Sequence, residues 1–495
     1  MPVLKIHDHD NVAVALADIT KGSTLSVGNE TLTAQEDIAR GHKIALTSLQ
    51  TGDHVIKYGF PIGHATKPVA AGEWLHTHNV KTNLGELLEY SYEPKPAAPL
   101  PSVSKKTFQG YRRADGRVGI RNEIWIIPTV SCVNRAAQLL ARYGQEKCQN
   151  FKNIDGVHEF THPHGCSQLG SDHETTQRIL ADFVNHPNAG GVLVLGLGCE
   201  NNNIPEFQKV IGDYDPDRVK FIIAQEVEDE LASGEALIDE LLEYAAKNER
   251  VTCDASELVV GLKCGGSDGF SGITANPLVG SLSDSLIAAG GSTVLTEVPE
   301  MFGAETILMN RAKTKEIFEK TVHLINDFKE YFQSYNQPIY ENPSPGNKKG
   351  GISTLEEKSL GCTQKGGRAT VVDVLKYGDQ VKEKGLSLLN GPGNDAVAST
   401  VLAAAGCHII LFTTGRGTPL GTTVPTMKIA TNSPLFTYKA NWMDFNAGKL
   451  LEGHSLPEVT EELFDEILAV ASGKQTKNET MGFREIAIFK NGVTL

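Results

Sequence analysis

The stretch Leu-Val-Val-Gly-Leu-Lys-Cys-Gly-Gly-Ser-Asp-Gly, residues 258–269, decides the fold of the larger part of the chain. It begins as an apolar run and changes at Lys263 to a polar, glycine-rich segment. Apolar runs of this kind are typical of strands buried in a parallel sheet. Because open α/β sheets bind ligands where their strands end, the residues after Leu262 are candidates for a functional site.

The same pattern recurs from residue 120 onward, where apolar runs alternate with helical periodicity. The expected strands are residues 124–127, 192–197, 221–224, 258–262, 293–296, 370–374 and 408–413. The expected helices between them are residues 134–143, 172–185, 226–247, 304–335 and 395–405. This alternation predicts an α/β fold with a doubly wound parallel sheet.

The first 91 residues have a different character. Short strand-like pieces at residues 13–16, 24–27 and 54–56 are separated by glycine turns, which predicts a small all-β module over residues 1–91. Proline at positions 94, 96, 99 and 101 excludes a helix or a central strand there, so we place a stiff linker at residues 92–107. We divide the remaining chain into a first α/β region, 108–250, and a C-terminal region, 251–495.

Composition excludes several classes of protein. The chain of 495 residues has 46 Lys and Arg against 60 Asp and Glu, a formal net charge of −14, which argues against nucleic-acid or anionic-membrane binding. It lacks an apolar run long enough for a transmembrane helix, and its N-terminus does not resemble a secretion signal. Eight cysteines without a CxxC pair are too sparse for a disulfide scaffold, so we expect a cytoplasmic protein with reduced thiols.

Polar residues gather at the predicted strand ends. Five segments, four of which contain glycine, carry Cys, His, carboxylate or Arg side chains: residues 162–168, 198–203, 263–269, 297–300 and 414–419. Five such segments in one sheet suggest a shared site, and the mixture of ligand types favours iron or another borderline cation. The alternative is that the cysteines are ordinary buried residues. We expect Cys148 and Cys253 to be structural, and Cys132 and Cys407 to belong to the core.

Other motifs have a functional and an ordinary interpretation. Arg416 lies between two glycines, which favours bidentate binding of a carboxylate, and the alternative is a surface arginine. Seven of the 15 histidines lie before residue 80, and His42, His76 and His78 either bind a ligand and transfer protons or lie in solvated turns. The segment 391–396 matches G-x-G-x-x-A, but the acidic residue that a dinucleotide site requires is missing from the end of the next strand.

Taken together, the motifs resemble those of the altronate/galactarate dehydratase family over nearly the whole chain. The segments that carry the resemblance are residues 40–43, 76–79, 164–170, 196–202, 264–269, 296–303, 342–347, 359–365 and 414–419. The resemblance implies an N-terminal SAF-type β-clip, a linker, a dimerising middle region and a Rossmann-like variant at the C-terminus. It also implies a homodimer and a dehydratase that uses Fe2+, with Mn2+ as the alternative.

The implied reaction is dehydration of D-altronate to 2-dehydro-3-deoxy-D-gluconate. A base removes the proton next to the carboxylate, a cation stabilises the enediolate, and the 3-hydroxyl leaves as water. The candidate metal ligands are Cys166, Cys199, Cys264, Glu297 and Cys362. The candidate catalytic residues are Glu297, His164, Asp268, His42, His76 and His78, and the candidate substrate-binding residues are Arg416, Gln168 and Asn201.

Three alternatives stay open at this point. Galactarate or a related aldarate is an alternative substrate. An iron–sulfur cluster held by three or four of Cys166, Cys199, Cys264 and Cys362 is an alternative to a single ion. A sugar-acid sensor without activity is the alternative to an enzyme.

Overall fold

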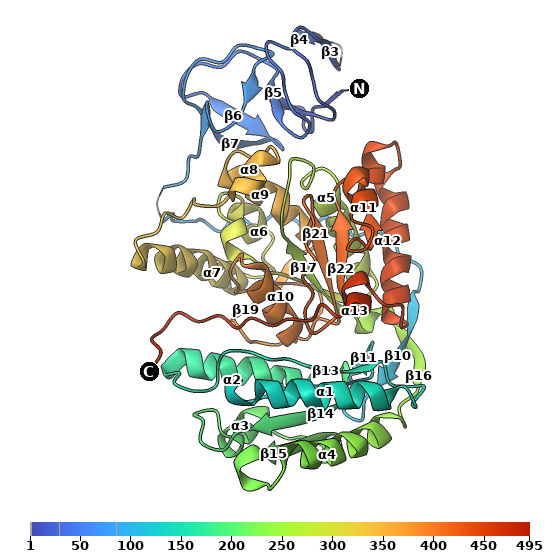
Figure 1. The fold of residues 1–495 in the computed structure, drawn as a ribbon. Coiled ribbons are helices and arrows are strands. Elements are labelled where there is room, and N and C mark those ends of the chain that lie inside the picture. Colours follow the sequence, from blue (N-terminus) through green and yellow to red (C-terminus); the bar gives the residue numbers. More distant parts are fainter. Residues whose placement is uncertain (1, 29, 86) are drawn as a thin grey trace.

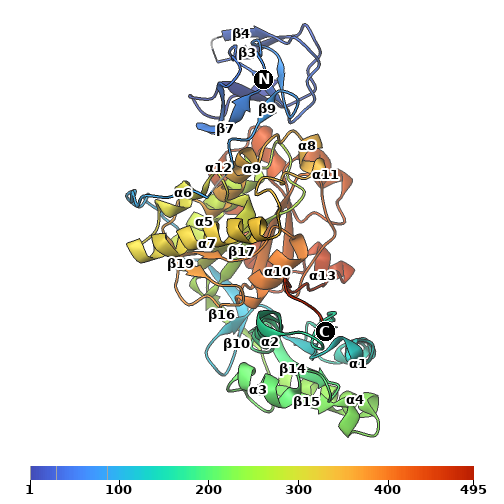
Figure 2. The same ribbon diagram turned by 90° about the vertical axis from the view of Figure 1, so that its left-hand side faces the viewer.

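The computed structural model describes residues 2–28, 30–85 and 87–495. A small β module, a large parallel sheet with its helices, and a second α/β unit follow one another along the molecule, and the two perpendicular views agree on this order (Figures 1 and 2). Residues 1, 29 and 86, which belong to the predicted 1–91 module, lie outside the described residues.

The N-terminal module consists of short strands, as predicted. They form a sheet of order β1-β2-β5-β8, a hairpin β3-β4 and a sheet of order β6-β7-β9. Their bounds are Val3–Leu4 (β1), Val12–Ala15 (β2), Thr24–Val27 (β3), Glu30–Thr33 (β4), Lys43–Ala45 (β5), His54–Lys57 (β6), Phe60–Ala65 (β7), Trp74–Leu75 (β8) and Val80–Lys81 (β9). Small and β-branched side chains fill its two apolar clusters.

A linker follows β9, and its described residues between 82 and 106 form neither helix nor strand. It lies against the large α/β unit rather than extending into solvent. The backbone N–H of Lys95 donates to the carbonyl of Asn310 (2.8 Å), and the hydroxyl of Tyr90 donates to Glu305 (2.5 Å). The linker therefore has a defined course along the surface.

The second α/β unit is built on the parallel sheet β13-β12-β14-β15, called the middle sheet below. Helices α1 and α4 cover one face, and α2 and α3 cover the other. An antiparallel ribbon, β11-β10-β16, connects this unit to the next. The bounds are Thr107–Arg112 (β10), Val118–Gly119 (β11), Glu123–Pro128 (β12), Asn134–Cys148 (α1), Gly156–Glu159 (β13), Gly170–Val184 (α2), Ala189–Gly196 (β14), Ile204–Ile211 (α3), Val219–Ile223 (β15), Glu230–Ala245 (α4) and Arg250–Asp254 (β16).

The C-terminal region contains the large sheet, of order β19-β20-β18-β17-β21-β22-β23, in which the paired strands are parallel. The strands are Val259–Cys264 (β17), Ser292–Leu295 (β18), Val371–Leu375 (β19), Leu386–Leu389 (β20), Ile409–Thr414 (β21), Thr426–Ala430 (β22) and Phe445–Asn446 (β23). The helices are Ala275–Ala288 (α5), Glu305–Met309 (α6), Lys315–Ser334 (α7), Pro345–Lys349 (α8), Leu355–Cys362 (α9), Asp395–Ala404 (α10), Ser433–Tyr438 (α11), Leu456–Ala471 (α12) and Lys477–Met481 (α13). The predicted α/β fold with parallel strands is confirmed.

One expectation about this fold is wrong. The predicted strands do not form one sheet, because 124–127, 192–197 and 221–224 belong to the middle sheet and the later ones belong to the large sheet. The predicted helix 304–335 is also divided, since the Thr314 side chain accepts from the N–H of Ile317 and caps a new helix, α7.

The two sheets nevertheless share a packed boundary. Helix α2 packs on α10, and one apolar cluster contains residues of both sheets, including Trp125 and Ile410. Residues near the C-terminus return to the middle sheet unit, where the N–H of Leu495 donates to the carbonyl of Ser167 (3.0 Å). None of the helices in the described part of the chain is long and apolar enough to cross a membrane.

Candidate metal centre and active site

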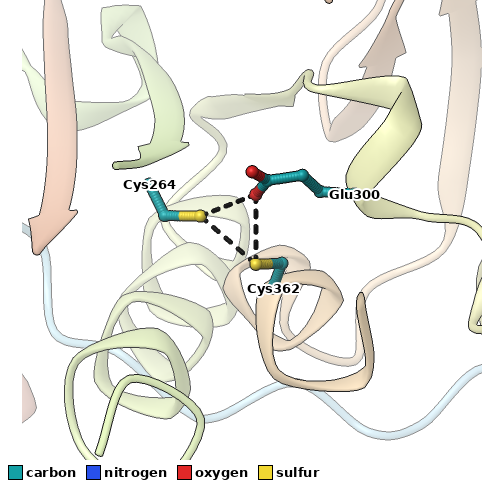
Figure 3. A group of neighbouring side chains, drawn as sticks. All are labelled: Cys264, Glu300 and Cys362. Carbon is teal, nitrogen blue, oxygen red and sulfur yellow. Dashed lines mark hydrogen bonds between the residues drawn. The ribbon is translucent and has the colours of Figure 1, made fainter. Parts of the chain in front are cut away.

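Two thiols and a carboxylate meet at the carboxyl edge of the large sheet. Cys264 ends β17, Glu300 ends the short turn of helix that follows β18, and Cys362 ends α9. Figure 3 shows the three side chains pointing toward one another. The two Sγ atoms are 3.2 Å apart, and Oε2 of Glu300 lies 2.8 Å from Sγ of Cys264 and 3.2 Å from Sγ of Cys362. All three residues are buried.

Three buried lysines surround this group: Lys263, Lys358 and Lys365, called the lysine trio below. Lys358 pairs with Oε1 of Glu300 (2.7 Å). Lys263 and Lys365 pair with Glu297, whose other contact is the N–H of Cys264 (2.8 Å). Glu297 is thus a counter-charge for two lysines, whereas Glu300 is the carboxylate that contacts both thiols.

The lysine trio determines the ionisation of the two glutamates. Burial alone would raise the pKa of Glu300, but the lysine trio lowers it far below its usual value. Burial raises the pKa of Glu297, and the charge of Glu300 acts in the same direction. The pKa of Cys362 is raised well above its usual value, first by its hydrogen bond with Cys264 and then by burial.

These residues fit a divalent cation. In the described part of the chain, Cys264, Glu300 and Cys362 form a group whose possible ligand atoms all lie within 4.8 Å of one another. The three ammonium groups of the lysine trio balance three carboxylates, because Lys263 also lies 2.8 Å from Asp395, so their net charge is zero. When a divalent cation replaces both thiol protons, that net charge does not change, so the lysines are compensated in both states.

A cavity of about 720 Å³ opens onto this centre. Glu300 and Lys358 line it, together with Asn342 of the loop before α8, Asn347 of α8 and Asp395 at the start of α10. The ammonium group of Lys358 lies within 3.3 Å of both amide oxygens, Oδ1 of Asn342 and Oδ1 of Asn347. Charged and amide groups in a cavity of this size suit a small, hydroxylated anion.

A second cavity, of about 650 Å³, lies in the N-terminal module where it meets α8. His42, Trp74 and His76 line it, and Lys348 lines both cavities. The ring of His76 stacks on Trp74 with centroids 5.5 Å apart, and burial lowers the pKa of His76 to about 4. His76 is therefore neutral near pH 7, at the boundary between the module and the centre.

Buried ion pairs hold the module in place. Lys43 and Lys57 of the module each lie 2.8 Å from a different carboxylate oxygen of Glu357 on α9. The ring nitrogen Nδ1 of His76 lies 3.1 Å from Oγ of Ser353. Because α9 also carries Cys362, the module contacts the same helix that supplies the metal centre.

Some candidate residues of the sequence lie near this centre without contacting the thiols. Asp268 is buried, and its carboxylate accepts hydrogen bonds from the N–H groups of Phe270 (3.1 Å) and Ser271 (3.0 Å) and from the hydroxyl of Thr431 (3.1 Å). Arg416 is exposed, and its side-chain stem lies against Gly266, which lines the larger cavity. These contacts place Asp268 as a support of the loop after β17.

His42 and His78 surround the ring of Trp74 in the module. Trp74 donates to Nδ1 of His42 (3.1 Å), whose Nε2 lies 3.3 Å from the carbonyl of Lys349. His78 is exposed, and its ring lies 4.8 Å from that of Trp74.

The remaining candidates lie at the carboxyl edge of the middle sheet. His164, Cys166 and Gln168 belong to the loop between β13 and α2, and Cys199 and Asn201 belong to the loop after β14. The expectation that all these segments share one site is wrong, because their strands belong to a different sheet from that of Cys264 and Cys362. Cys132, expected in the core, is exposed, whereas Cys407 is buried as expected.

Sequence reasoning missed Glu300 and the lysine trio as parts of the centre. Glu300 lies in the segment 297–300 that the strand-end pattern selects, but the pattern does not distinguish it from Glu297. Nothing in the sequence indicated that the three lysines are buried at the centre, because buried lysines are rare and their partners are distant in sequence.

Family models and full-length relatives match nearly the whole chain. Family models match residues 1–83 ("Altronate/galactarate dehydratase SAF domain"), 110–246 ("D-galactarate dehydratase/Altronate hydrolase, second domain") and 255–494 ("D-galactarate/Altronate dehydratase, C-terminal"). Altronate dehydratase of Escherichia coli (strain K12) is 54% identical over 495 residues, 100% of both chains. Altronate dehydratase of Bacillus subtilis (strain 168) is 56% identical over 493 residues, 99% of both chains. Galactarate dehydratase (L-threo-forming) of Escherichia coli (strain K12) is 34% identical over 511 residues, 98% of this chain and 96% of the relative.

Proposed function

The chain belongs to the altronate/galactarate dehydratase family, and we propose that it is a hydro-lyase that converts D-altronate to 2-dehydro-3-deoxy-D-gluconate and water. The observation that carries the choice of substrate is the identity of more than 50% with two altronate dehydratases over the full length. Galactarate dehydratase is a more distant relative, at 34%. A galactarate or aldarate substrate is therefore the second candidate.

Cys264, Glu300 and Cys362 are the residues that we propose to hold the cation. Two thiolates and one carboxylate are compatible with Fe2+, and Mn2+ is the alternative. When bound, the cation supplies Lewis-acid stabilisation of the negative charge that develops as the proton next to the substrate carboxylate leaves. Glu297 lies close to these ligands but is held by Lys263 and Lys365, so we keep it as a support of the centre.

Lys358 is the side chain best placed to bind the substrate carboxylate. It lines the cavity, and its ammonium group is oriented by Asn342, Asn347 and Glu300. A fixed positive charge there favours the enediolate over the ground-state carboxylate, because the negative charge of the substrate increases as the proton leaves.

We propose that neutral His76 binds the hydroxyl end of the substrate by a hydrogen bond. Its ring nitrogen Nδ1 lies 3.1 Å from Oγ of Ser353, which leaves Nε2 for a substrate that reaches the second cavity. His42 has both ring nitrogens in contact with protein groups, so it serves to orient Trp74 and His76. His164, Asp268, His78, Arg416, Gln168 and Asn201 stay as sequence predictions whose roles depend on substitution experiments. The homodimer and the cytoplasmic location are likewise predictions that follow from the family resemblance alone.

The test is turnover under anaerobic conditions with Fe2+ and a thiol reductant. D-altronate is expected to yield a 2-keto acid with a kcat/KM well above that for galactarate. The Glu300→Gln variant is expected to lose bound metal and activity together, whereas His76→Gln is expected to lower kcat at unchanged metal content. Binding of D-altronate without any 2-keto acid would favour a sensor, and faster turnover of galactarate would favour the second candidate.

A further inference from the structure

Three exposed cysteines gather at the carboxyl edge of the middle sheet. Cys132 follows β12, Cys166 follows β13, and Cys199 follows β14. These strands are adjacent and parallel, in the order β13-β12-β14, so their carboxyl ends lie side by side. These three thiols are exposed, whereas Cys148 of α1 in the same unit is buried. The proposed dehydratase reaction, centred on the large sheet, makes no use of them.

Hydrogen bonds join the three loops that carry these cysteines. The N–H of Ser131 donates to the carbonyl of His164 (3.0 Å), and the N–H of Asn202 donates to the carbonyl of Gly165 (3.1 Å). The N–H of Ser167 donates to Oδ1 of Asn201 (3.0 Å). In each of these bonds, both the donor residue and the acceptor residue lie within three positions of one of the cysteines. The three thiols are therefore carried by one connected set of loops.

The loop with Cys166 is held close to the end of β12. A Cβ on Gly165 (φ +99°) would lie 2.0 Å from the carbonyl oxygen of Thr129, so only glycine fits there. Ser167 has φ +59°, an unfavourable value for a residue with a side chain. Cys166 thus lies between a required glycine and a strained serine, a combination typical of ligand-binding loops.

Two buried side chains in these loops have polar atoms to spare. Nε2 of Gln168 and Oδ1 of Asn202 are buried without a hydrogen-bond partner among the described residues. Gln168 is 3% exposed and Asn202 is fully buried. The other side-chain amide atom of each residue forms a hydrogen bond near the cysteines. Oε1 of Gln168 accepts from the N–H of Gly165 (3.2 Å), and Nδ2 of Asn202 donates to the carbonyl of Thr129 (3.2 Å). An unpaired N–H donor of this kind is able to bond the sulfur of a bound inorganic group.

The spacing of the thiols excludes a preformed site for one ion. Thiolates on a single zinc-like ion lie about 2.3 Å from the metal, so their sulfur atoms lie within about 4.6 Å of one another. Among the described residues, Cys132, Cys166 and Cys199 do not form a group whose ligand atoms all lie within 4.8 Å. Adjacent strands are about 4.8 Å apart, so thiols that follow three neighbouring strands are expected to lie farther apart than the ligands of a single ion. Several metal atoms, joined by inorganic sulfide, fill the space between such thiols.

We propose that Cys132, Cys166 and Cys199 bind a [4Fe–4S] cluster at the carboxyl edge of the middle sheet. Each thiol releases its proton when its sulfur binds iron, and iron and sulfide supply the rest of the cluster. Three protein thiolates leave one iron without a cysteine ligand. This site differs from the Cys264 centre in its sheet, its exposure and its requirement for sulfide.

The test uses the full-length chain, purified without oxygen and reconstituted with ferrous iron and sulfide. About four iron atoms and four acid-labile sulfides per chain are expected in the cluster. The protein should also be brown, with a visible absorption band that bleaches on reduction with dithionite. The absence of bound sulfide from the reconstituted protein would overturn the proposal.

Serine variants assign the cluster to its ligands. The triple variant Cys132→Ser/Cys166→Ser/Cys199→Ser is expected to lose the sulfide and the colour. Each of the three single substitutions is expected to lower the sulfide content and the colour without changing the thermal unfolding of the protein, because the three cysteines are exposed. Cys148→Ser and the pair Cys264→Ser/Cys362→Ser are expected to retain the sulfide. Retention of sulfide by the triple variant, or its loss only in the Cys264/Cys362 pair, would contradict the assignment. Because the readout is sulfide and colour, its result is independent of whether D-altronate is the substrate.

Discussion

At the scale of single residues, Glu297 and Glu300 show how neighbouring carboxylates acquire different tasks. Both follow β18 and both are buried, but Glu297 has a left-handed backbone (φ 69°) that directs it to Lys263, while Glu300 reaches the thiols. The presence of polar residues after a predicted strand was sufficient to select the segment 297–300 as part of a functional site. It was not sufficient for the side chain, because the partners Lys358 and Cys362 lie about 60 residues away.

Glu297→Gln is expected to destabilise the protein strongly. The substitution leaves Lys365 and Lys263 buried with less compensating charge, and breaking a buried pair costs about 3–5 kcal/mol. Denaturant unfolding of the metal-free protein measures this loss. The control is Glu461→Gln, which removes an exposed partner of Lys106 and should cost less than about 1 kcal/mol. Equal effects of the two substitutions would contradict the buried-pair explanation.

His408 is expected to make stability depend on pH. Burial lowers the pKa of His408 to about 4, and the neutral ring accepts from the N–H of Val259 (3.0 Å) while its Nε2 lies 2.8 Å from the carbonyl of Val118. Between about pH 6.5 and pH 4 the unfolded chain binds a proton that folded His408 does not. Stability should therefore fall as the pH falls through this window, by up to about 1.4 kcal/mol per unit.

The measurement is denaturant unfolding at several pH values between 6.5 and 5. His408→Gln removes the titrating group, so its free energy of unfolding should change less steeply with pH than that of the unsubstituted protein. Parallel curves for the two proteins would show that His408 does not contribute.

At the scale of elements, apolar runs predicted the central strands well but not their ends. The run 258–262 predicts a strand, and β17 continues through Lys263 and Cys264 because their polar groups are buried and bonded to Glu297. Helix α5 was not predicted, because buried Asn276, Ser283 and Asp284 interrupt its apolar pattern. Hydropathy does not recognise a buried polar group whose partner lies far away in sequence.

The same limit explains why the candidate site was only partly predicted. Cys264 and Cys362 were both selected as ligands from residue type and motif, and the structure brings them into contact. Cys166 and Cys199 were selected by the same criteria, but residue type does not reveal that their strands belong to another sheet. The division into two sheets depends on long-range packing that a pattern of apolar runs does not contain.

Close backbone contact between elements is expected to make Gly269 intolerant of a side chain. A Cβ there would lie 2.0 Å from the carbonyl oxygen of Gly41 in the N-terminal module. Gly269→Ala should weaken docking of the module by roughly 1–3 kcal/mol, the usual range for overpacking. The readout is faster proteolysis within the linker between residues 82 and 106. Gly85→Ala, which meets nothing within 4 Å, is the matched control, and equal cleavage rates would contradict the contact.

At the scale of the whole molecule, the contact between the module and the large α/β unit contains buried charge as well as an apolar cluster that includes Ala304 and Leu360. Lys43, Lys57 and Glu357 are all buried, and the two ammonium groups lie on different oxygens of one carboxylate (Figure 1 shows β6, β7 and α9 near this boundary). The two lysines lower the pKa of Glu357 to about 2, against the effect of burial. Such pairs give little net stability but specify one arrangement.

Glu357→Gln is expected to release the module while leaving both sheets folded. Two buried ammonium groups would lose their counter-charge, and solvation of the separated module is the least costly response. Small-angle scattering should report a larger radius of gyration, and kcat should fall because His76 moves away from the cavity. An unchanged radius together with unchanged kcat would contradict this role of Glu357.

The course of linker residues 82–106 has a kinetic consequence. Because the module remains covalently attached, its release and return are unimolecular, and its effective concentration near the large sheet depends on the length of the tether. Dilution of the protein for an enzyme assay therefore does not change the fraction of molecules in which the module is docked on the large α/β unit. Weak docking would appear as a fixed fraction of open molecules at every protein concentration, a behaviour that separates it from subunit dissociation.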